Sequence, residues 1–281
     1  MLKAQGLDLY KRGQLTNLAS TQIHLLFCLV TSLSIHAMNY IFSLPDEVKI
    51  LALSELHKED EIVTENTFRQ HGYTASVSPA EKSEVRNHGG ECVAVRSYIN
   101  SKPVPTEVQD RVKECFMTAL RFSARVVRFR GAEIIFFAAY FWVYEGFSQR
   151  NITILRQIDM VIKMSGLPWI AFGDFNITFE DFQESEWLQY LDADLLHPNM
   201  KSTTSLSQNR VIDFGLMSRS LKGMFRKSRP IYTVPWGPHF AALYEFVMDP
   251  MALRGKVVCI PRSLPMKISE TSGKRWQRIN S

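Results

Sequence analysis

An acid and an amide two residues apart end an apolar run in the middle of the chain. The segment Leu167–Asn176 is apolar or small until it reaches Asp174 and Asn176. Side chains alternate along a strand, so these two are expected to point the same way at the strand end. A carboxylate there can attract a hard cation or activate water, and a carboxamide can donate hydrogen bonds to a phosphate. The pair predicts phosphoester chemistry, and the alternative is a buried strand that ends in an Asp/Asn turn.

Three more polar residues follow or lie within apolar, strand-like runs. Glu55 follows residues 50–54, Asp213 lies within Val211–Met217, and His239 precedes the last apolar run. If these strand ends meet at one edge, the side chains can divide the work. Glu55 would bind a divalent cation, His239 would bind or polarise phosphate, Asp213 would orient the imidazole, and Asp174 would activate water. Taken singly, each residue also fits a capping acid or a satisfied core histidine.

The elements that must position these residues alternate between strand-like runs and amphipathic stretches, with no internal repeat. An Arg-Gly-Ala turn at 130–132 joins two of the runs and predicts a hairpin, hence antiparallel pairing. The polar segment 57–87 is expected to be a surface excursion. Strands are expected at 25–32, 50–53, 91–98, 124–130, 133–142, 169–172, 211–217 and 241–247, with shorter ones near Tyr73 and Ile231, and helices at 105–119, 149–164 and 179–191.

Length and composition bound the class of protein. The chain has 281 residues, 46% hydrophobic and 22% charged, which is enough to bury a large core. Residues 254–281 hold seven basic residues and one acidic residue, a net charge of +6, whereas the whole chain carries +5. We expect an N-terminal extension at 1–20, one main domain at 21–250, and a basic tail at 251–281 that is disordered beyond about residue 264. The tail could contact phosphates or could be a solvated end.

Cysteine usage and hydropathy indicate an intracellular protein, nuclear or cytoplasmic. The four cysteines at 28, 92, 115 and 259 are too scattered for a metal cluster, so reduced, buried thiols are expected. The apolar run at 25–33 is too short and too interrupted to cross a bilayer and reads as a core strand. No membrane association is expected, and the chain is expected to be a monomer.

The ordered set of motifs resembles the endonuclease/exonuclease/phosphatase family, which includes deoxyribonuclease-like and apurinic-site endonucleases. The matching elements are 54–57 (Ser-Glu-Leu-His), the Gly-Gly strand 89–95, the Gly-Asp-x-Asn signature 173–176, the Ile-Asp-Phe element 212–218 and the closing triplet 237–239. A strand Tyr, a Gly and a helix-entry Asn are matched by Tyr140, Gly146 and Asn151. The resemblance spans about residues 25–248. Spacings of 119, 39 and 26 residues between the successive acids and the histidine suit a compact member.

The resemblance implies an α/β (α+β) fold, a four-layer sandwich of two mostly antiparallel mixed sheets flanked by helices. It implies Mg²⁺ as the cofactor, with Mn²⁺ as a possible substitute, and Glu55 as its ligand. Asp174, Asn176, Asp213, His239 and Tyr140 are implied to be catalytic. Asn176 and Tyr140 would donate to phosphate or to the transition state. Tyr140 also reads as core within its apolar run, and Tyr144 competes for its role. Trp142 is expected to pack, while Trp236 could pack or stack on a base.

Two positions depart from the family pattern. Leu29 stands where the family usually has an Asn near the metal, 26 residues before Glu55, and Pro238 stands where an Asp precedes the closing His. Loss of such partners typically lowers metal affinity or activity by about 10- to 100-fold.

Three functional classes therefore follow from the sequence. The first is a Mg²⁺-dependent endonuclease that acts on DNA, of the kind found in retroelements, with nucleic acid as its partner and reduced activity. The second is a phosphatase of phosphoinositides or other small phosphoesters. The third is a catalytically inactive relative that binds nucleic acid or protein. Substrate choice resides in loops that the motifs do not specify.

Overall fold

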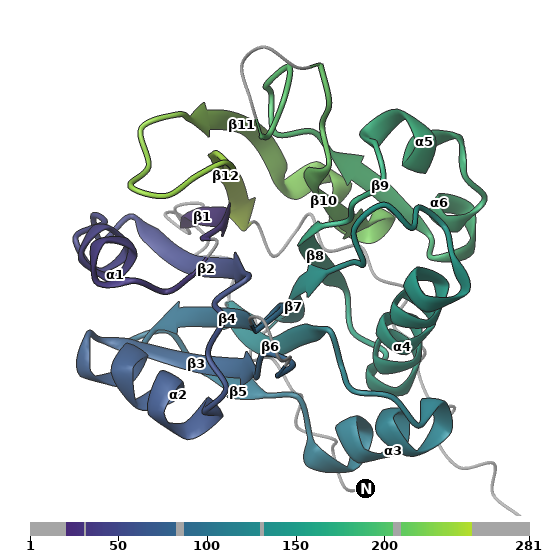
Figure 1. The fold of residues 1–281 in the computed structure, drawn as a ribbon, viewed down its shortest axis with the longest axis horizontal. Coiled ribbons are helices and arrows are strands. Elements are labelled where there is room, and N and C mark those ends of the chain that lie inside the picture. The colour runs from purple at the N-terminus through teal and green to yellow at the C-terminus, as the bar shows by residue number, and fades with distance from the viewer. Residues whose placement is uncertain (1–20, 31, 83–86, 130–131, 205–208, 249–281) are drawn as a thin grey trace, which may run out of the picture.

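Two six-stranded sheets pack face to face in the computed structural model, which describes residues 21–30, 32–82, 87–129, 132–204 and 209–248 (Figure 1). The expected terminal segments 1–20 and 251–281 lie outside this range. The first sheet has the order β11 (Phe225–Ile231), β12 (Ala241–Met248), β1 (Thr21–Leu29), β2 (Val48–Ser54), β4 (Glu91–Arg96) and β3 (Tyr73–Ser78). The second has the order β5 (Ser101–Pro103), β6 (Phe122–Phe129), β7 (Ala132–Tyr140), β8 (Trp169–Asp174), β10 (Asp213–Ser218) and β9 (Ala193–Leu196).

Helices cover the outer faces of both sheets. Between the sheets lies a core to which both contribute, with Phe27 and Phe172 stacked at a centroid distance of 5.7 Å. A second apolar cluster joins the other face of the second sheet to its helices, and a third joins the first sheet to its own. The helices are α1 (Ile35–Phe42), α2 (Glu61–Gln70), α3 (Thr106–Phe116), α4 (Gln149–Ser165), α5 (Phe179–Glu184), α6 (Trp187–Tyr190) and the 3₁₀ helix η1 (Arg219–Met224). The expected sandwich of two mixed sheets flanked by helices is confirmed.

The burial of β8, the β6–β7 hairpin and the caps of α4 agree with the sequence. All six residues of β8 are buried, as expected of a central strand that is covered on both faces. The predicted hairpin is present as the antiparallel pair β6–β7, whereas β7–β8 and β1–β2 are parallel. Helix α4 begins after Ser148, whose hydroxyl accepts from the Asn151 N–H, and ends at Gly166, which has φ +63°.

Some elements differ from expectation. The segment 57–87, expected to be a surface excursion, contains the helix α2, because Phe68 supplies a buried anchor despite the polar composition. The short strand expected near Tyr73 is present as the edge strand β3. The helix expected at 179–191 is two short helices, since the backbone at Ser185 is extended. Cys28 and Cys92 are buried free thiols, but Cys115 is exposed, contrary to expectation, and Cys259 lies outside the described residues.

A search of the described helices finds none both long enough and apolar enough to span a membrane.

Candidate active site

The strand ends that carry the predicted residues meet at one rim of the sandwich. Strand pairing sets Tyr140, the last residue of β7, beside Asp174, the last residue of β8, and sets Asp174 beside Asp213, the first residue of β10. Glu55 directly follows β2, and His239 lies two residues before β12. The parallel strands β7 and β8 end at the same sheet edge at which the antiparallel strand β10 begins. Five residues that span positions 55 to 239 therefore lie at this rim.

Two acids and the histidine form the tightest group. Asp174, Asp213 and His239 each offer a ligand atom within 4.8 Å of the other two. His239 Nδ1 lies 2.9 Å from Asp213 Oδ2. Burial lowers the pKa of His239, but the charge of Asp213 and the bond to it act more strongly in the other direction and raise the pKa to about 9. The imidazole is therefore charged at neutral pH, and its Nδ1 is held by Asp213.

Burial and the charge of Asp213 raise the pKa of Asp174 well above its usual range. Three acidic side chains, those of Glu55, Asp174 and Asp213, surround the His239 imidazole at this rim, and their mutual repulsion disfavours the ionised form of Asp174.

Glu55 and Tyr140 form the second half of the site. Burial raises the pKa of Glu55, but His57, Tyr140 and His239 lower it more, so the carboxylate is ionised. His57 Nε2 lies 3.9 Å from Glu55 Oε1. Burial and the charge of Glu55 raise the pKa of Tyr140, which keeps its phenol protonated as a donor. The Ser54 hydroxyl donates to the Ala139 carbonyl at 3.1 Å and so ties β2 of one sheet to β7 of the other.

Asn176 supports the loop that follows β8. Its backbone has φ +50°, a left-handed conformation that Asn tolerates better than most residues. Its N–H donates to Asp174 Oδ1 at 3.0 Å, and its Nδ2 donates to the Phe141 carbonyl at 2.9 Å. One Nδ2 hydrogen is thus engaged in holding the loop that follows β8.

The glycine of the Gly-Asp-x-Asn signature has a packing reason. A Cβ on Gly173 would lie 2.8 Å from the carbonyl oxygen of Ala139 in the neighbouring strand β7. We expect Gly173→Ala to lower the free energy of unfolding by about 1–3 kcal/mol, because the backbone must shift to relieve the contact. Urea unfolding measures this. Gly223→Ala, where the added Cβ meets nothing within 4 Å, is the control, and equal losses in the two variants would contradict the packing argument.

Thr203 is a site-supporting residue that sequence reasoning missed. Its buried hydroxyl accepts from the backbone N–H groups of Ile212 and Asp213 at 3.2 and 3.3 Å, and its carbonyl accepts from Phe240 N–H. It therefore fixes the segments that carry both Asp213 and His239. Its position in a Ser-Thr-Thr run of a loop carries no signal that sets it apart from a surface residue.

Three further residues that the sequence singled out lie outside the buried cluster. Tyr144, the competitor of Tyr140, is 89% exposed and lines a hollow beside Asn176, whereas Tyr140 is buried. Trp142 is partly buried and packs against the helix-covered core, as expected. Trp236 also packs, edge to face with Tyr40 at a centroid distance of 5.4 Å. Leu29 pairs with Ser54 at the end of β1, but its side chain lies outside the described set.

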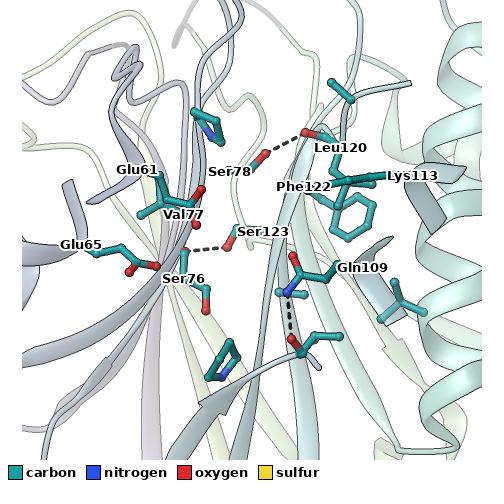
Figure 2. Close-up of a pocket in the computed structure, with 16 residues that line it drawn as sticks. Glu61, Glu65, Ser76, Val77, Ser78, Gln109, Lys113, Leu120, Phe122 and Ser123 are labelled. Carbon is teal, nitrogen blue, oxygen red and sulfur yellow. Dashed lines mark hydrogen bonds between the residues drawn. The ribbon is translucent and has the colours of Figure 1, made fainter. Parts of the chain in front are cut away.

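A separate hollow lies where β3 and β6 approach each other beside α2 and α3 (Figure 2). Its volume is about 250 Å³. Its polar groups bond to nearby backbone: the hydroxyls of Ser123 and Ser78 donate to carbonyls at 2.6 and 2.7 Å, and Gln109 Nε2 donates to one at 2.8 Å. None of the predicted site residues lines it. We interpret it as a seam between the sheets.

The donor set at the rim fits a hard divalent cation. Asp213 Oδ1 is buried and has no hydrogen-bond partner among the described residues, and it lies close to the carboxyl group of Asp174. Oxygen donors with one imidazole nearby suit Mg²⁺ or Mn²⁺. The sequence pointed to Glu55 as the ligand. The oxygens of Asp174 and Asp213 lie close enough together to add to it, whereas a charged His239 would not bind a cation.

Comparison with known proteins places this geometry in context. The sequence matches no protein-family profile and no curated protein. Among solved structures, the endonuclease domain of TRAS1, a telomere-specific non-LTR retrotransposon, superposes with a TM-score of 0.60 at 16% identity, covering 81% of this chain and 99% of that one. The AP endonuclease LMAP from Leishmania major gives 0.61 at 12% identity, with coverages of 81% and 88%.

A third solved structure carries the family's name. An endonuclease/exonuclease/phosphatase family protein from Bacteroides thetaiotaomicron gives a TM-score of 0.57 at 12% identity, covering 82% of this chain and 99% of that one. Identities this low establish the shared fold and leave the chemistry to the residues at the rim. With its paired six-stranded sheets, their helical covers and the polar cluster at one end, this chain has the fold of the endonuclease/exonuclease/phosphatase family.

Proposed function

We propose that this chain is a metal-dependent phosphodiester hydrolase that acts as an endonuclease on DNA. The observation that carries the proposal is the buried group of Asp174, Asp213 and His239, whose ligand atoms lie within 4.8 Å of one another at the rim. Glu55 and Tyr140 adjoin it. The neighbours of known activity, a retrotransposon endonuclease domain and an AP endonuclease, favour nucleic acid over a small phosphoester.

In the proposed mechanism each side chain has its own task on the metal, the water or the phosphate. The ionised Glu55 would hold Mg²⁺, which when bound neutralises phosphate charge and stabilises the leaving oxygen. Asp174 orients and deprotonates the attacking water. His239 donates from Nε2 to a nonbridging oxygen, while Asp213 keeps the ring charged and fixed. Tyr140 and Asn176 donate further hydrogen bonds as negative charge develops.

The charge on His239 sets a pH limit on this mechanism. The pKa of His239, about 9, lies above its usual value, so the charged donor is present below pH 9 and is lost as the pH rises through 9. We expect kcat/KM to fall about tenfold per pH unit on the alkaline side. In Asp213→Asn the charge that raises the pKa is absent, so the fall should begin at lower pH. An alkaline limb that does not move in this variant would contradict the assignment.

The site differs from the family pattern at Pro238, and the difference favours a second candidate, a non-catalytic nucleic-acid-binding relative. Pro238 is exposed and directly precedes His239.

We expect Pro238→Asp to raise the rate of plasmid nicking about 10-fold, because it restores a carboxylate beside the site. Pro235→Asp adds the same charge three residues earlier and serves as the control. No gain at saturating Mg²⁺ would weigh against partial loss of catalysis as the reason for the departure.

The test of the proposal is a nicking assay on supercoiled plasmid with Mg²⁺, with EDTA and with the Asp174→Asn variant. Nicking that needs the metal and disappears in the variant supports the endonuclease. Absence of cleavage with retained DNA binding points to the non-catalytic relative. Phosphate release from a soluble inositol phosphate without DNA cleavage would select a phosphatase instead.

A further inference from the structure

A hollow of about 350 Å³ lies close to Tyr140 and outside the catalytic cluster. We name it the Trp142 pocket. Its walls come from the loop between α3 and β6, the residues that follow β7, and the first three turns of α4. The residues that matter here are Thr118, Arg121, Trp142, Arg150, Thr153 and Gln157. Trp142 is two residues beyond Tyr140, and the Arg121 guanidinium donates from Nε to the Tyr140 carbonyl at 3.2 Å. The pocket therefore adjoins the proposed catalytic site through shared backbone.

Two guanidinium groups are held rigidly in the pocket wall. The guanidinium carbons of Arg121 and Arg150 lie 3.8 and 3.5 Å from the centroid of the Trp142 ring. At these distances both cannot occupy the same face, so they sandwich the indole. Such stacking stabilises each cation and fixes the plane of its guanidinium group. Both arginines pair with a glutamate, Arg121 with Glu81 at 3.0 Å and Arg150 with Glu145 at 2.8 Å. They differ in exposure: Arg121 is buried, whereas half of the Arg150 side chain is exposed and can contact a further anion.

The start of α4 adds to the attraction for an anion. Gln149, Arg150 and Thr153, all in the first two turns of this 17-residue helix, line the pocket. The partial positive charge of a helix N-terminus favours a phosphate there.

One polar group in the wall, the Gln157 amide, has an atom without a partner among the described residues. Gln157 is fully buried; its Nε2 donates to Thr118 Oγ1 at 2.9 Å, and its Oε1 has no hydrogen-bond partner in the described part of the chain. Exchanging the amide oxygen and nitrogen would still leave one of the two unpaired. Arg121 Nη2 does not add to this, because it lies beside Gly89, which does not line the pocket. The unpaired amide atom of Gln157 is matched by a ligand that offers a complementary donor or acceptor, such as the edge of a nucleobase.

We propose that the Trp142 pocket binds one nucleotide of the substrate strand, next to the phosphate that is cut. Its phosphate contacts Arg150 at the start of α4, and its base enters the hollow toward Gln157 and Thr118. A free phosphate would leave the base-sized part of the hollow, which Ile154 and Ala119 line with apolar surface, without contacts. This inference rests on the proposed function, because it takes a nucleic-acid strand as the substrate.

The test measures binding without cleavage. The full-length chain is titrated in EDTA against a fluorescein-labelled single-stranded 12-mer by anisotropy. We expect Arg150→Ala to weaken binding about fivefold and Thr153→Trp, which fills the hollow, about tenfold. Arg156→Ala, an exposed arginine of the same helix outside the pocket, should stay within about twofold of wild type. AMP should displace the 12-mer from wild type but not from Thr153→Trp, and inorganic phosphate at the same concentration should displace neither. Circular dichroism confirms that the variants fold.

The outcomes separate this inference from the proposed function. If wild type nicks plasmid but Arg150→Ala and Arg156→Ala bind alike, the pocket is not a nucleotide site and the endonuclease proposal stands. If Thr153→Trp binds the 12-mer as tightly as wild type does, the proposal that the pocket binds a nucleotide is likewise wrong. If wild type never nicks DNA yet loses affinity in Arg150→Ala and Thr153→Trp, the nucleotide site stands and the hydrolase proposal fails.

Discussion

Asp174→Asn is expected to lower the rate of plasmid nicking by about 10²–10⁴-fold while leaving the fold intact. The substitution keeps the size of the side chain and its acceptor for the Asn176 N–H, which lies 3.0 Å from Oδ1. It removes the group that would take a proton from water. Because burial and the charge of Asp213 disfavour the ionised form of Asp174 in the folded chain, the neutral Asn should not lower stability.

The same variant distinguishes catalysis from binding. Affinity for the labelled 12-mer should change little, because Asp174 acts on water and not on the flanking strand. The contrast is with Asn176→Ala, which removes the bond to the Phe141 carbonyl and should affect both loop order and rate. Nicking at more than a tenth of the wild-type rate in Asp174→Asn would show that another group activates the water.

Phe214→Ala is expected to lower the free energy of unfolding by about 3–5 kcal/mol, the largest stability effect among the single changes. The Phe214 ring is fully buried and lies 4.5 Å from the Phe175 ring and 5.6 Å from the Phe182 ring, centroid to centroid. Truncation leaves a cavity in an aromatic cluster that rigid strands on one side cannot fill. Phe214 also adjoins Asp213 in sequence, so activity should fall as the cluster loosens.

Urea unfolding followed by tryptophan fluorescence measures the loss. Phe214→Leu keeps most of the volume and should cost less than half as much. Ile62→Ala, at a side chain that is 71% exposed, should change stability by no more than about 0.5 kcal/mol. A cost for Phe214→Ala near that of Ile62→Ala would mean that the cluster is not a packed core.

Much of this architecture could be predicted from the sequence because its signals are local. The apolar run that ends at Asp174 marks a central strand, and the Arg-Gly-Ala turn marks the β6–β7 hairpin. Predicting that Asp174, Asp213 and His239 cluster required the order of the motifs along the chain, because no local sequence pattern indicates that β8 pairs with β10.

What the sequence could not predict depends on contacts between distant segments. Helix α2 lies in a polar segment, and the burial of Phe68 against the first sheet is what defines it. Thr203 and Arg121 act through bonds to backbone atoms of other segments, which hydrophobic periodicity does not encode. The sandwich of Trp142 between two arginines, from 21 residues before it and 8 after it, is likewise visible only in three dimensions.

The proposed reaction requires groups from both halves of the sandwich at once, because Glu55 follows a strand of one sheet while Asp174 and Asp213 belong to strands of the other. The alignment of these groups therefore depends on the apolar layer between the sheets and on the bond from Ser54 to Ala139. A slide of one sheet over the other by a fraction of an ångström would misalign the reacting groups without unfolding anything. Substitutions deep in that apolar layer, although remote from any substrate, should therefore change kcat.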